Sequence, residues 1–391
     1  MVKLLSMTSK IRKPRWQCIG ASVRGSSHNR TGLPNQDAIR WFPNSSRQDE
    51  PSLILAISDG HGSSKSFRSD IGSRIAVEVA GKVIGEKHSV TRTVGDIKKI
   101  EDIAHLHLPR KLVQAWMDSI DEHWRQNQVS DEEWSQLKQK GVVRQEIEEN
   151  PSLAYGATLL AVLVTETFIL YIQQGDGDIL CVDSEGCVSR PMEPDPRLIA
   201  NETTSLCTPK GWNDFRIHLK PYPESLVERM PTLILVSTDG YANSYSSEEE
   251  FIKIGSDYLQ MVQSSEMSQV MQQLPDFLKE TSLKGSGDDI TLGVIKRIES
   301  ENSMANQQKK TSRAISYIIF GLAFNSLLAI ISLASNLWLW TRLISLQQSF
   351  NLPPSTDSTN NRGTPSSSKT PSSSSTTPTA TPSSSTTPTA N

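Results

Sequence analysis

Four short acidic motifs stand along the first 290 residues, each beside a segment that reads as a strand. They are Gln36-Asp37, Asp59-Gly60-His61-Gly62, Asp239-Gly240 and Asp288-Asp289. A strand that ends in Asp-Gly places a carboxylate at the rim of its sheet, and the glycine allows close approach of the backbone to whatever the carboxylate binds. One Asp-Gly pair is ordinary turn chemistry. Four acidic motifs at strand ends instead predict carboxylates gathered around hard metal ions.

The strands that would position these motifs are apolar and rich in β-branched residues. The runs 53–58 and 233–238 lead directly into the second and third motifs, and the run 290–295 follows the fourth. Carboxylate and carbonyl oxygens, with no cluster of three histidines or of cysteines, favour Mg²⁺ or Mn²⁺ over zinc.

The cysteines and the overall charge exclude several classes of protein. The four cysteines form no CxxC pair, so the sequence predicts neither a zinc site nor a disulfide framework, and the thiols read as reduced and cytosolic. A net charge of −3 is too small to predict a nucleic-acid partner. Residues 1–15 are basic, but no apolar stretch follows them, which argues against a cleaved signal peptide.

The chain before residue 299 is a mixture of long strands and separate helical blocks. Strands are expected at 16–22 and, as a pair, at 157–164 and 168–173. Helices are expected at 66–84, within 96–149, at 247–255 and at 266–281, while 185–215 is rich in loops. In 96–149 the packing residues are expected to be Trp116, Trp124 and Trp134. This arrangement predicts an α+β fold, not alternating βαβ units.

The composition changes sharply at residues 314–340. This stretch has no charged residue and is long enough to cross a bilayer as one helix with some tilt. Trp338 and Trp340 stand where an interfacial aromatic belt would lie. A buried core helix is the alternative, but such helices are seldom this long without charge. The stretch predicts a transmembrane helix.

The residues that flank this span predict its orientation. Lys309, Lys310 and Arg313 precede it, whereas Arg342 alone follows closely. The positive-inside rule then keeps the N-terminal domain in the cytoplasm, with 299–313 as a juxtamembrane linker. Residues 341–391 are dominated by Pro, Ser and Thr and are expected to form a disordered tail on the opposite side of a single-pass membrane protein.

The acidic motifs belong to a longer ordered series. The series is Gly20-Ala21-Ser22 with Asn35-Gln36-Asp37-Ala38, Ser58-Asp59-Gly60-His61-Gly62, Gly156-Ala157-Thr158, Gly175-Asp176-Gly177, Ser237-Thr238-Asp239-Gly240 and Gly287-Asp288-Asp289-Ile290-Thr291. In this order the motifs resemble the metal-dependent protein phosphatase 2C family, in its bacterial type with a C-terminal membrane anchor. The resemblance covers residues 16–297 and implies a catalytic domain at 16–298, built as a central sandwich of two antiparallel β-sheets flanked by helices.

The resemblance also implies a chemistry. In the family two Mg²⁺ or Mn²⁺ ions lie side by side, and hydroxide formed from the water between them attacks the phosphoryl group of phosphoserine or phosphothreonine. Asp37 and Asp59 match the bridging ligands, with the Gly60 carbonyl on one ion, and Asp239 and Asp288 match the ligands of the other ion.

Residues around these ligands match the family less uniformly. His61 matches a histidine proposed to protonate the leaving group, with the ordering of metal-bound waters as the alternative role. Asp176 is expected to support the site or the fold nearby. Gln36 stands where an acidic residue is usual, and Asp289 stands where Asn is usual, so both are possible outer contacts of the metals.

The sequence does not single out the residue that would bind the substrate phosphate. The family uses an Arg shortly before the first motif, at a position that Gly32 occupies here. The candidates are therefore Arg24, His28 and Arg30, any of which could instead be a solvated loop charge.

Three hypotheses follow. The first is a membrane-tethered phosphatase that acts on phosphoserine or phosphothreonine in cytoplasmic proteins. The second, suggested by Gln36, is a pseudophosphatase that serves as a phosphoprotein-binding or regulatory module. The third is a sensor that responds through the outer tail. The sequence names neither the substrate nor the oligomeric state.

Overall fold

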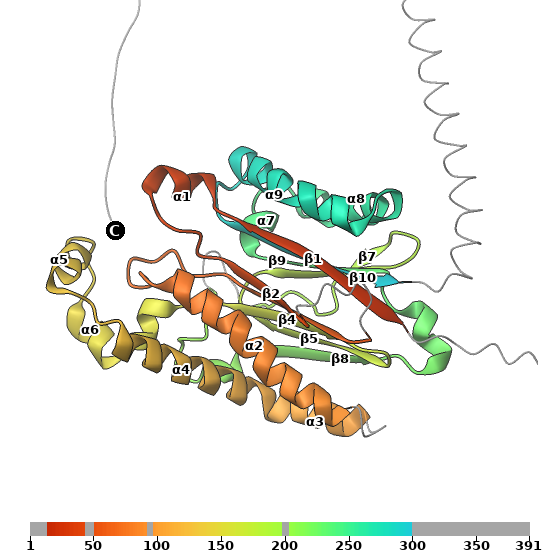
Figure 1. Ribbon diagram of the computed structural model, residues 1–391, viewed down its shortest axis with the longest axis horizontal. Coiled ribbons are helices and arrows are strands. Elements are labelled where there is room, and N and C mark those ends of the chain that lie inside the picture. Colours follow the sequence, from red (N-terminus) through yellow and green to blue (C-terminus); the bar gives the residue numbers. More distant parts are fainter. Residues whose placement is uncertain (1–13, 44–50, 92–96, 198–202, 299–391) are drawn as a thin grey trace, which may run out of the picture. The chain divides into compact units, whose positions relative to one another are not determined.

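The computed structural model describes residues 14–43, 51–91, 97–197 and 203–298 (Figure 1). Nearly all of the basic N-terminal segment, and the whole of the predicted linker, membrane span and tail, fall outside these ranges, so those predictions remain untested. Within the described ranges, no helix combines the length and the apolar composition that crossing a membrane requires.

The described chain is built around two sheets, each of five strands. The first has the order β1 (Arg15–Val23), β10 (Ile290–Ile298), β9 (Leu233–Ser237), β6 (Asp178–Val182) and β7 (Val188–Ser189). The second has the order β2 (Ala38–Phe42), β3 (Leu53–Ser58), β4 (Leu159–Val164), β5 (Phe168–Gln174) and β8 (Arg216–Pro221). Every neighbouring pair is antiparallel. The predicted pair of antiparallel sheets is confirmed.

The two sheets pack face to face through apolar side chains. Leu55 and Ile57 of β3 and Val236 of β9 are fully buried in the layer between the sheets. Residues of β3 on the opposite face, such as Ala56, pack beneath α2 in a second cluster. Both faces of β3 are therefore buried, which explains why its sequence is a continuous apolar run without alternation.

Helices cover the outer face of each sheet (Figure 1). The long helices α2 (Ser69–Thr91), α3 (Ile97–Leu106) and α4 (Leu108–Gln126) lie over the sheet that contains β3. The other sheet is covered by α8 (Glu248–Ser264) and α9 (Met267–Lys284). The shorter helices are α1 (Ser26–Thr31), α5 (Asp131–Gln139), α6 (Arg144–Glu149) and α7 (Asp239–Ala242), and the 3₁₀ turns are η1 (Pro151–Tyr155), η2 (Gly211–Asn213) and η3 (Glu224–Arg229).

Most helices expected from the sequence are present, with longer or divided bounds. The helix predicted at 66–84 begins at Ser69 and continues to Thr91, and those predicted at 247–255 and 266–281 extend to 264 and 284. The block 96–149 contains four helices: Pro109 lies in the first turn of α4, the Ser130 capping box begins α5, and α6 follows Val143. Trp116 and Trp134 are buried and Trp124 packs against the same cluster, which confirms their expected role.

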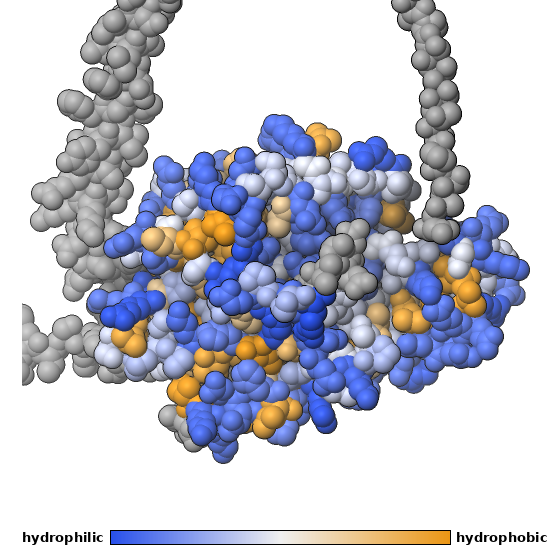
Figure 2. Space-filling view, turned by 180° about the vertical axis from the view of Figure 1, so that it is seen from behind, coloured by the Kyte–Doolittle hydropathy of each residue, from blue (hydrophilic) through white to orange (hydrophobic). Residues whose placement is uncertain are grey.

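The surface is mainly polar, with separate apolar patches among hydrophilic residues on the face drawn in Figure 2. Among the described residues, the large apolar side chains that are most exposed include three on α9. They are Leu33, Leu106, Val143 and, on α9, Met271, Phe277 and Leu283.

Replacing Leu55 with Ala should lower the free energy of unfolding by about 3 kcal/mol, because it opens a cavity between the two sheets. Chemical denaturation followed by circular dichroism measures this loss. Leu106→Ala is the matched control, since Leu106 is 65% exposed and its truncation should change stability by less than about 0.5 kcal/mol. Equal effects of the two substitutions would contradict the assigned packing.

Candidate metal centre

Strand pairing brings the four acidic motifs to one end of the sandwich. Ala38 of β2 lies opposite Ser58 of β3, so Asp37 and Asp59 extend from neighbouring strand ends. In the other sheet, the Thr238 amide donates to the Thr291 carbonyl (3.1 Å), which brings Asp239 close to Asp288. The fold therefore gathers the motifs that the sequence separates by up to about 250 residues.

Thr238 connects the two sheets at this end. Its hydroxyl donates to Asp37 Oδ2 (2.8 Å) and accepts from the Thr291 amide (3.0 Å). The sequence analysis quoted Thr238 only as part of a motif and missed this role. Because Asp37, beside the second sheet, lies 201 residues away, no local signal could have revealed the contact.

Hydrogen bonds to Thr158, the residue directly before β4, hold the backbone of Asp59 in place. Its amide donates to the Thr158 hydroxyl (3.0 Å), and the Thr158 amide donates back to the Asp59 carbonyl (2.8 Å). The next residue, Gly60, pairs with Ala157 as an isolated bridge. A Cβ on Gly60 would lie 2.6 Å from the Gln36 carbonyl oxygen and 2.8 Å from that of Ser69, so only glycine fits between these two segments.

The carboxylates raise one another's pKa. Burial raises the pKa of Asp37 well above its usual range, and the charge of Asp289 raises it further, against hydrogen bonds from Thr238 and Thr291 that lower it. Burial likewise raises the pKa of Asp59, followed by the charges of Asp37 and Asp239. These groups are therefore close enough to repel one another.

Asp239 belongs to the same group and has a partner that the sequence analysis missed. Burial raises its pKa, and the nearby charges of Asp176 and Asp288 add to that, while a hydrogen bond with Asp59 lowers it. Asn243 donates to Asp239 Oδ2 (3.0 Å). The spacing of four residues across a helical turn was the signal available in the sequence.

The loop around Asp288 is closely packed against two other segments. A Cβ on Gly25 would lie 2.3 Å from the Asp288 carbonyl carbon, and one on Gly240 would lie 2.1 Å from the Asp289 carbonyl oxygen. Both positions require glycine because backbone approaches backbone. The absence of these side chains brings α1, α7 and the Asp288 loop together.

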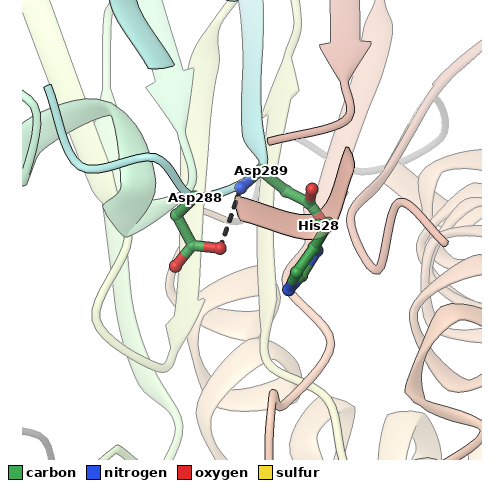
Figure 3. Close-up of side chains that lie close together, drawn as sticks. All are labelled: His28, Asp288 and Asp289. Carbon is green, nitrogen blue, oxygen red and sulfur yellow. Dashed lines mark hydrogen bonds and ion pairs between the residues drawn. The ribbon is translucent and has the colours of Figure 1, made fainter. Parts of the chain in front are cut away.

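The Asp289 carboxylate connects this loop to two other segments through hydrogen bonds. Its Oδ1 accepts from the Gly25 amide (2.6 Å), and its Oδ2 accepts from the Gln36 amide (2.6 Å). Oδ2 also lies 2.9 Å from His28 Nδ1. Figure 3 shows Asp289 beside the His28 ring, with Asp288 next to it in the chain. Asp289 thus holds the loops of the first and fourth motifs together.

Gln36 directs its side chain toward a helix. Its amide nitrogen donates to the Ser69 hydroxyl (2.7 Å) at the start of α2. Ser69 is a partner that sequence reasoning did not find. The Gln36 side chain is thereby tied to α2, and it stands at the position where the family usually carries an acidic residue.

His61 lies beside this group of carboxylates. Its amide donates to the Gly156 carbonyl (3.0 Å). Burial lowers the pKa of its imidazole below the usual value, and the charge of Asp176 opposes this. Asp176 therefore acts on His61, Asp59 and Asp239 alike, which places it at the edge of the group.

The three candidates for phosphate capture have different surroundings. Arg24 donates through Nη2 to the His28 carbonyl (2.9 Å), and Arg30 donates through Nη2 to the Ser27 hydroxyl (3.0 Å). Both guanidinium groups thus donate hydrogen bonds to residues of α1. His28 contacts the acidic motifs through Asp289.

The donor set fits hard divalent cations. Asp37, Asp59, Asp239 and Asp288 supply oxygen ligands, and three of them have raised pKa values that an added positive charge would lower. Aspartates crowded in this way are costly to ionise together without a cation. The residues therefore suit Mg²⁺ or Mn²⁺.

Replacing Asp59 with Asn should stabilise the metal-free protein at neutral pH by about 1 kcal/mol, because it removes one charge from a repelling group. Since the folded-state pKa of Asp59 is raised, its contribution to stability is complete at low pH and is lost as pH rises through that pKa. Thermal unfolding in excess chelator measures the difference.

The same variant should lose the stabilisation that added Mn²⁺ gives the unmodified chain. A metal-free Asp59→Asn variant less stable than the parent at pH 7, or one stabilised by Mn²⁺ as much as the parent, would contradict the assigned crowding.

Three solved structures illustrate the matches to this chain. The catalytic domain of the serine/threonine phosphatase PstP, crystallised with two manganese ions, is 15% identical over 73% of this chain and 100% of its own, with a TM-score of 0.42. PppA of Pseudomonas aeruginosa, described as a regulatory component of T6SS, is 14% identical over 73% and 99%, with a TM-score of 0.45. RsbX in complex with magnesium is 13% identical over 73% and 96%, with a TM-score of 0.38.

Sequence comparison gives the family. No curated protein sequence matches the chain. The family profile described as Protein phosphatase 2C matches residues 24–279. That span includes Asp37, Asp59 and Asp239 and is more than half of the 391 residues. The chain belongs to the protein phosphatase 2C family.

Proposed function

We propose that this chain is a metal-dependent phosphatase that hydrolyses phosphoserine and phosphothreonine in proteins. The observation that carries the proposal is the gathering of Asp37, Asp59, Asp239 and Asp288 at one end of the sandwich, with mutual repulsion that a cation would relieve. Membership of the protein phosphatase 2C family supports the same reaction.

The residues of the site have separate roles in this proposal. Asp37 and Asp59 would be shared by the two ions, the Gly60 carbonyl would bind one of them, and Asp239 and Asp288 would hold the other. Two Mg²⁺ or Mn²⁺ ions bound there would lower the pKa of a shared water and offset charge that develops on the phosphoryl oxygens. Thr238 and Thr158 keep Asp37 and Asp59 in position through the hydrogen bonds described above.

His61 is placed to serve the leaving group. Burial lowers the pKa of its imidazole, and the charge of Asp176 opposes this. The neutral ring can order water at the site, because it accepts one hydrogen bond and donates another. Passing a proton to the departing alkoxide requires the protonated ring, which the charge of Asp176 favours.

A catalytically inactive binding module is the second candidate, and one observation favours it. Gln36 occupies the position where an acidic residue is usual, and its side chain is bonded to Ser69 on α2. An inactive chain would still bind phosphoprotein through the metals. Turnover therefore separates the two functions, whereas binding does not.

Membrane tethering is part of the proposal. The uncharged stretch 314–340 and the basic residues before it support a single C-terminal span with the phosphatase domain in the cytoplasm and the tail on the other side. Tethering would raise the local concentration of the enzyme near membrane-bound partners.

The full-length chain should hydrolyse a phosphothreonine peptide when Mn²⁺ is present and should stop when excess chelator is added. Asp239→Ala should lower the rate at least about 100-fold, because one ion loses a ligand. Release of inorganic phosphate measures both. Asn243→Ala is a milder comparison, since it removes only the hydrogen bond to Asp239 Oδ2.

Metal-independent turnover, or full activity of Asp239→Ala, would contradict the metal assignment. Mn²⁺ binding by calorimetry without any turnover would favour the binding module.

Deleting residues 314–340 should move the protein from the membrane fraction to the soluble fraction of a cell lysate. Carbonate washing of the membranes distinguishes an integral protein from one that is merely adsorbed. If the unmodified chain were recovered in the soluble fraction, the membrane anchor would be excluded.

A further inference from the structure

A histidine lies beside the acidic motif nearest the C-terminal end of the domain. His28 is carried by α1 and reaches the loop that precedes β10. One ring nitrogen of His28, one carboxylate oxygen of Asp288 and one of Asp289 all lie within 4.8 Å of one another. Figure 3 shows the His28 ring and the Asp288 carboxylate directed to the same side of this loop.

Asp289 determines which His28 nitrogen is available. An ionised carboxylate only accepts hydrogen bonds, so the 2.9 Å contact requires a hydrogen on His28 Nδ1. In the neutral ring the lone pair is then on Nε2. A carboxylate behind one imidazole nitrogen is the usual support for a histidine that binds a metal through the other.

Asp289 itself is not free to bind an ion. Its Oδ1 accepts from the Gly25 amide and its Oδ2 from the Gln36 amide, both at 2.6 Å, in addition to His28. Its side chain is only 3% exposed, and that of His28 is 13% exposed. The buried carboxylate therefore orients the ring, and Asp288 remains as the ligand beside it.

The separation of the donors suits a shared ion. Oxygen and nitrogen ligands bind first-row divalent metals at about 2.0–2.2 Å, so two donors on one ion lie at most about 4.4 Å apart. One donor atom from each of the three residues lies within 4.8 Å of the other two, which is close to this value.

We propose that His28 Nε2 is a metal ligand, which joins Asp288 on one of the divalent cations while Asp289 fixes the ring. This inference rests on the proposed metal centre and makes it a mixed nitrogen and oxygen site at one ion. Imidazole suits transition metals, whereas Mg²⁺ prefers oxygen. The centre therefore favours Mn²⁺ over Mg²⁺ more strongly than an all-oxygen site would.

Pulsed electron paramagnetic resonance of the Mn²⁺-loaded, full-length chain tests this ligand. The unmodified chain should show coupling of ¹⁴N to bound Mn²⁺. His28→Asn should lose this coupling, because the Asn amide can still donate to Asp289 but has no second ring nitrogen. His61→Asn is the matched control and should keep it, since His61 is not a ligand in this account.

Metal affinity gives a second readout. His28→Asn should weaken Mn²⁺ binding by about 10- to 100-fold in calorimetry and change Mg²⁺ binding much less. If His28 only supported Asp289, the Asn side chain would preserve that hydrogen bond and both affinities would stay as in the parent chain.

The outcomes separate this inference from the proposed function. A chain that binds no Mn²⁺ overturns the metal centre and this ligand together. Bound Mn²⁺ without ¹⁴N coupling, or coupling that survives in His28→Asn, overturns the ligand alone. Weaker inhibition by inorganic phosphate in His28→Asn, with metal affinity unchanged, would assign His28 to phosphate capture instead.

Discussion

Repulsion between carboxylates at the end of the sandwich is the constraint on which the rest of the structure depends. Asp37, Asp59 and Asp239 are buried near one another, and their pKa values are raised first by burial and then by the neighbouring carboxylate charges. A folded chain keeps such a group only if the surrounding packing is strong enough to hold it. The apolar layer between two five-stranded sheets supplies that packing.

Close backbone contacts fix the positions of the loops that carry the acidic motifs. Gly60 and Gly240 allow neighbouring segments to approach where any side chain would collide. Asp289 then fixes the loops of the first and fourth motifs by accepting from Gly25 and Gln36. The proposed metal donors are thus held in place by neighbouring groups, which would reduce the rearrangement that metal binding requires.

The sequence predicted the strands well and the side-chain partners poorly, for a physical reason. The run 53–58 is buried on both faces, and burial of that kind leaves a continuous apolar signal. The orientation of Gln36 toward Ser69, and the bond from Thr238 to Asp37, depend on segments that only the folded chain brings together. The contact of His28 with Asp289 likewise depends on where the fold places α1.

Counting bound Mn²⁺ is the most direct test of the central claim that these aspartates form one centre for two ions. Titration of the metal-free, full-length chain, with free Mn²⁺ followed by its paramagnetic resonance signal, gives the stoichiometry without relying on any substrate. The account predicts two ions per chain at neutral pH, with at least one of them lost in Asp239→Ala. No bound Mn²⁺, or unchanged stoichiometry in that variant, would contradict it.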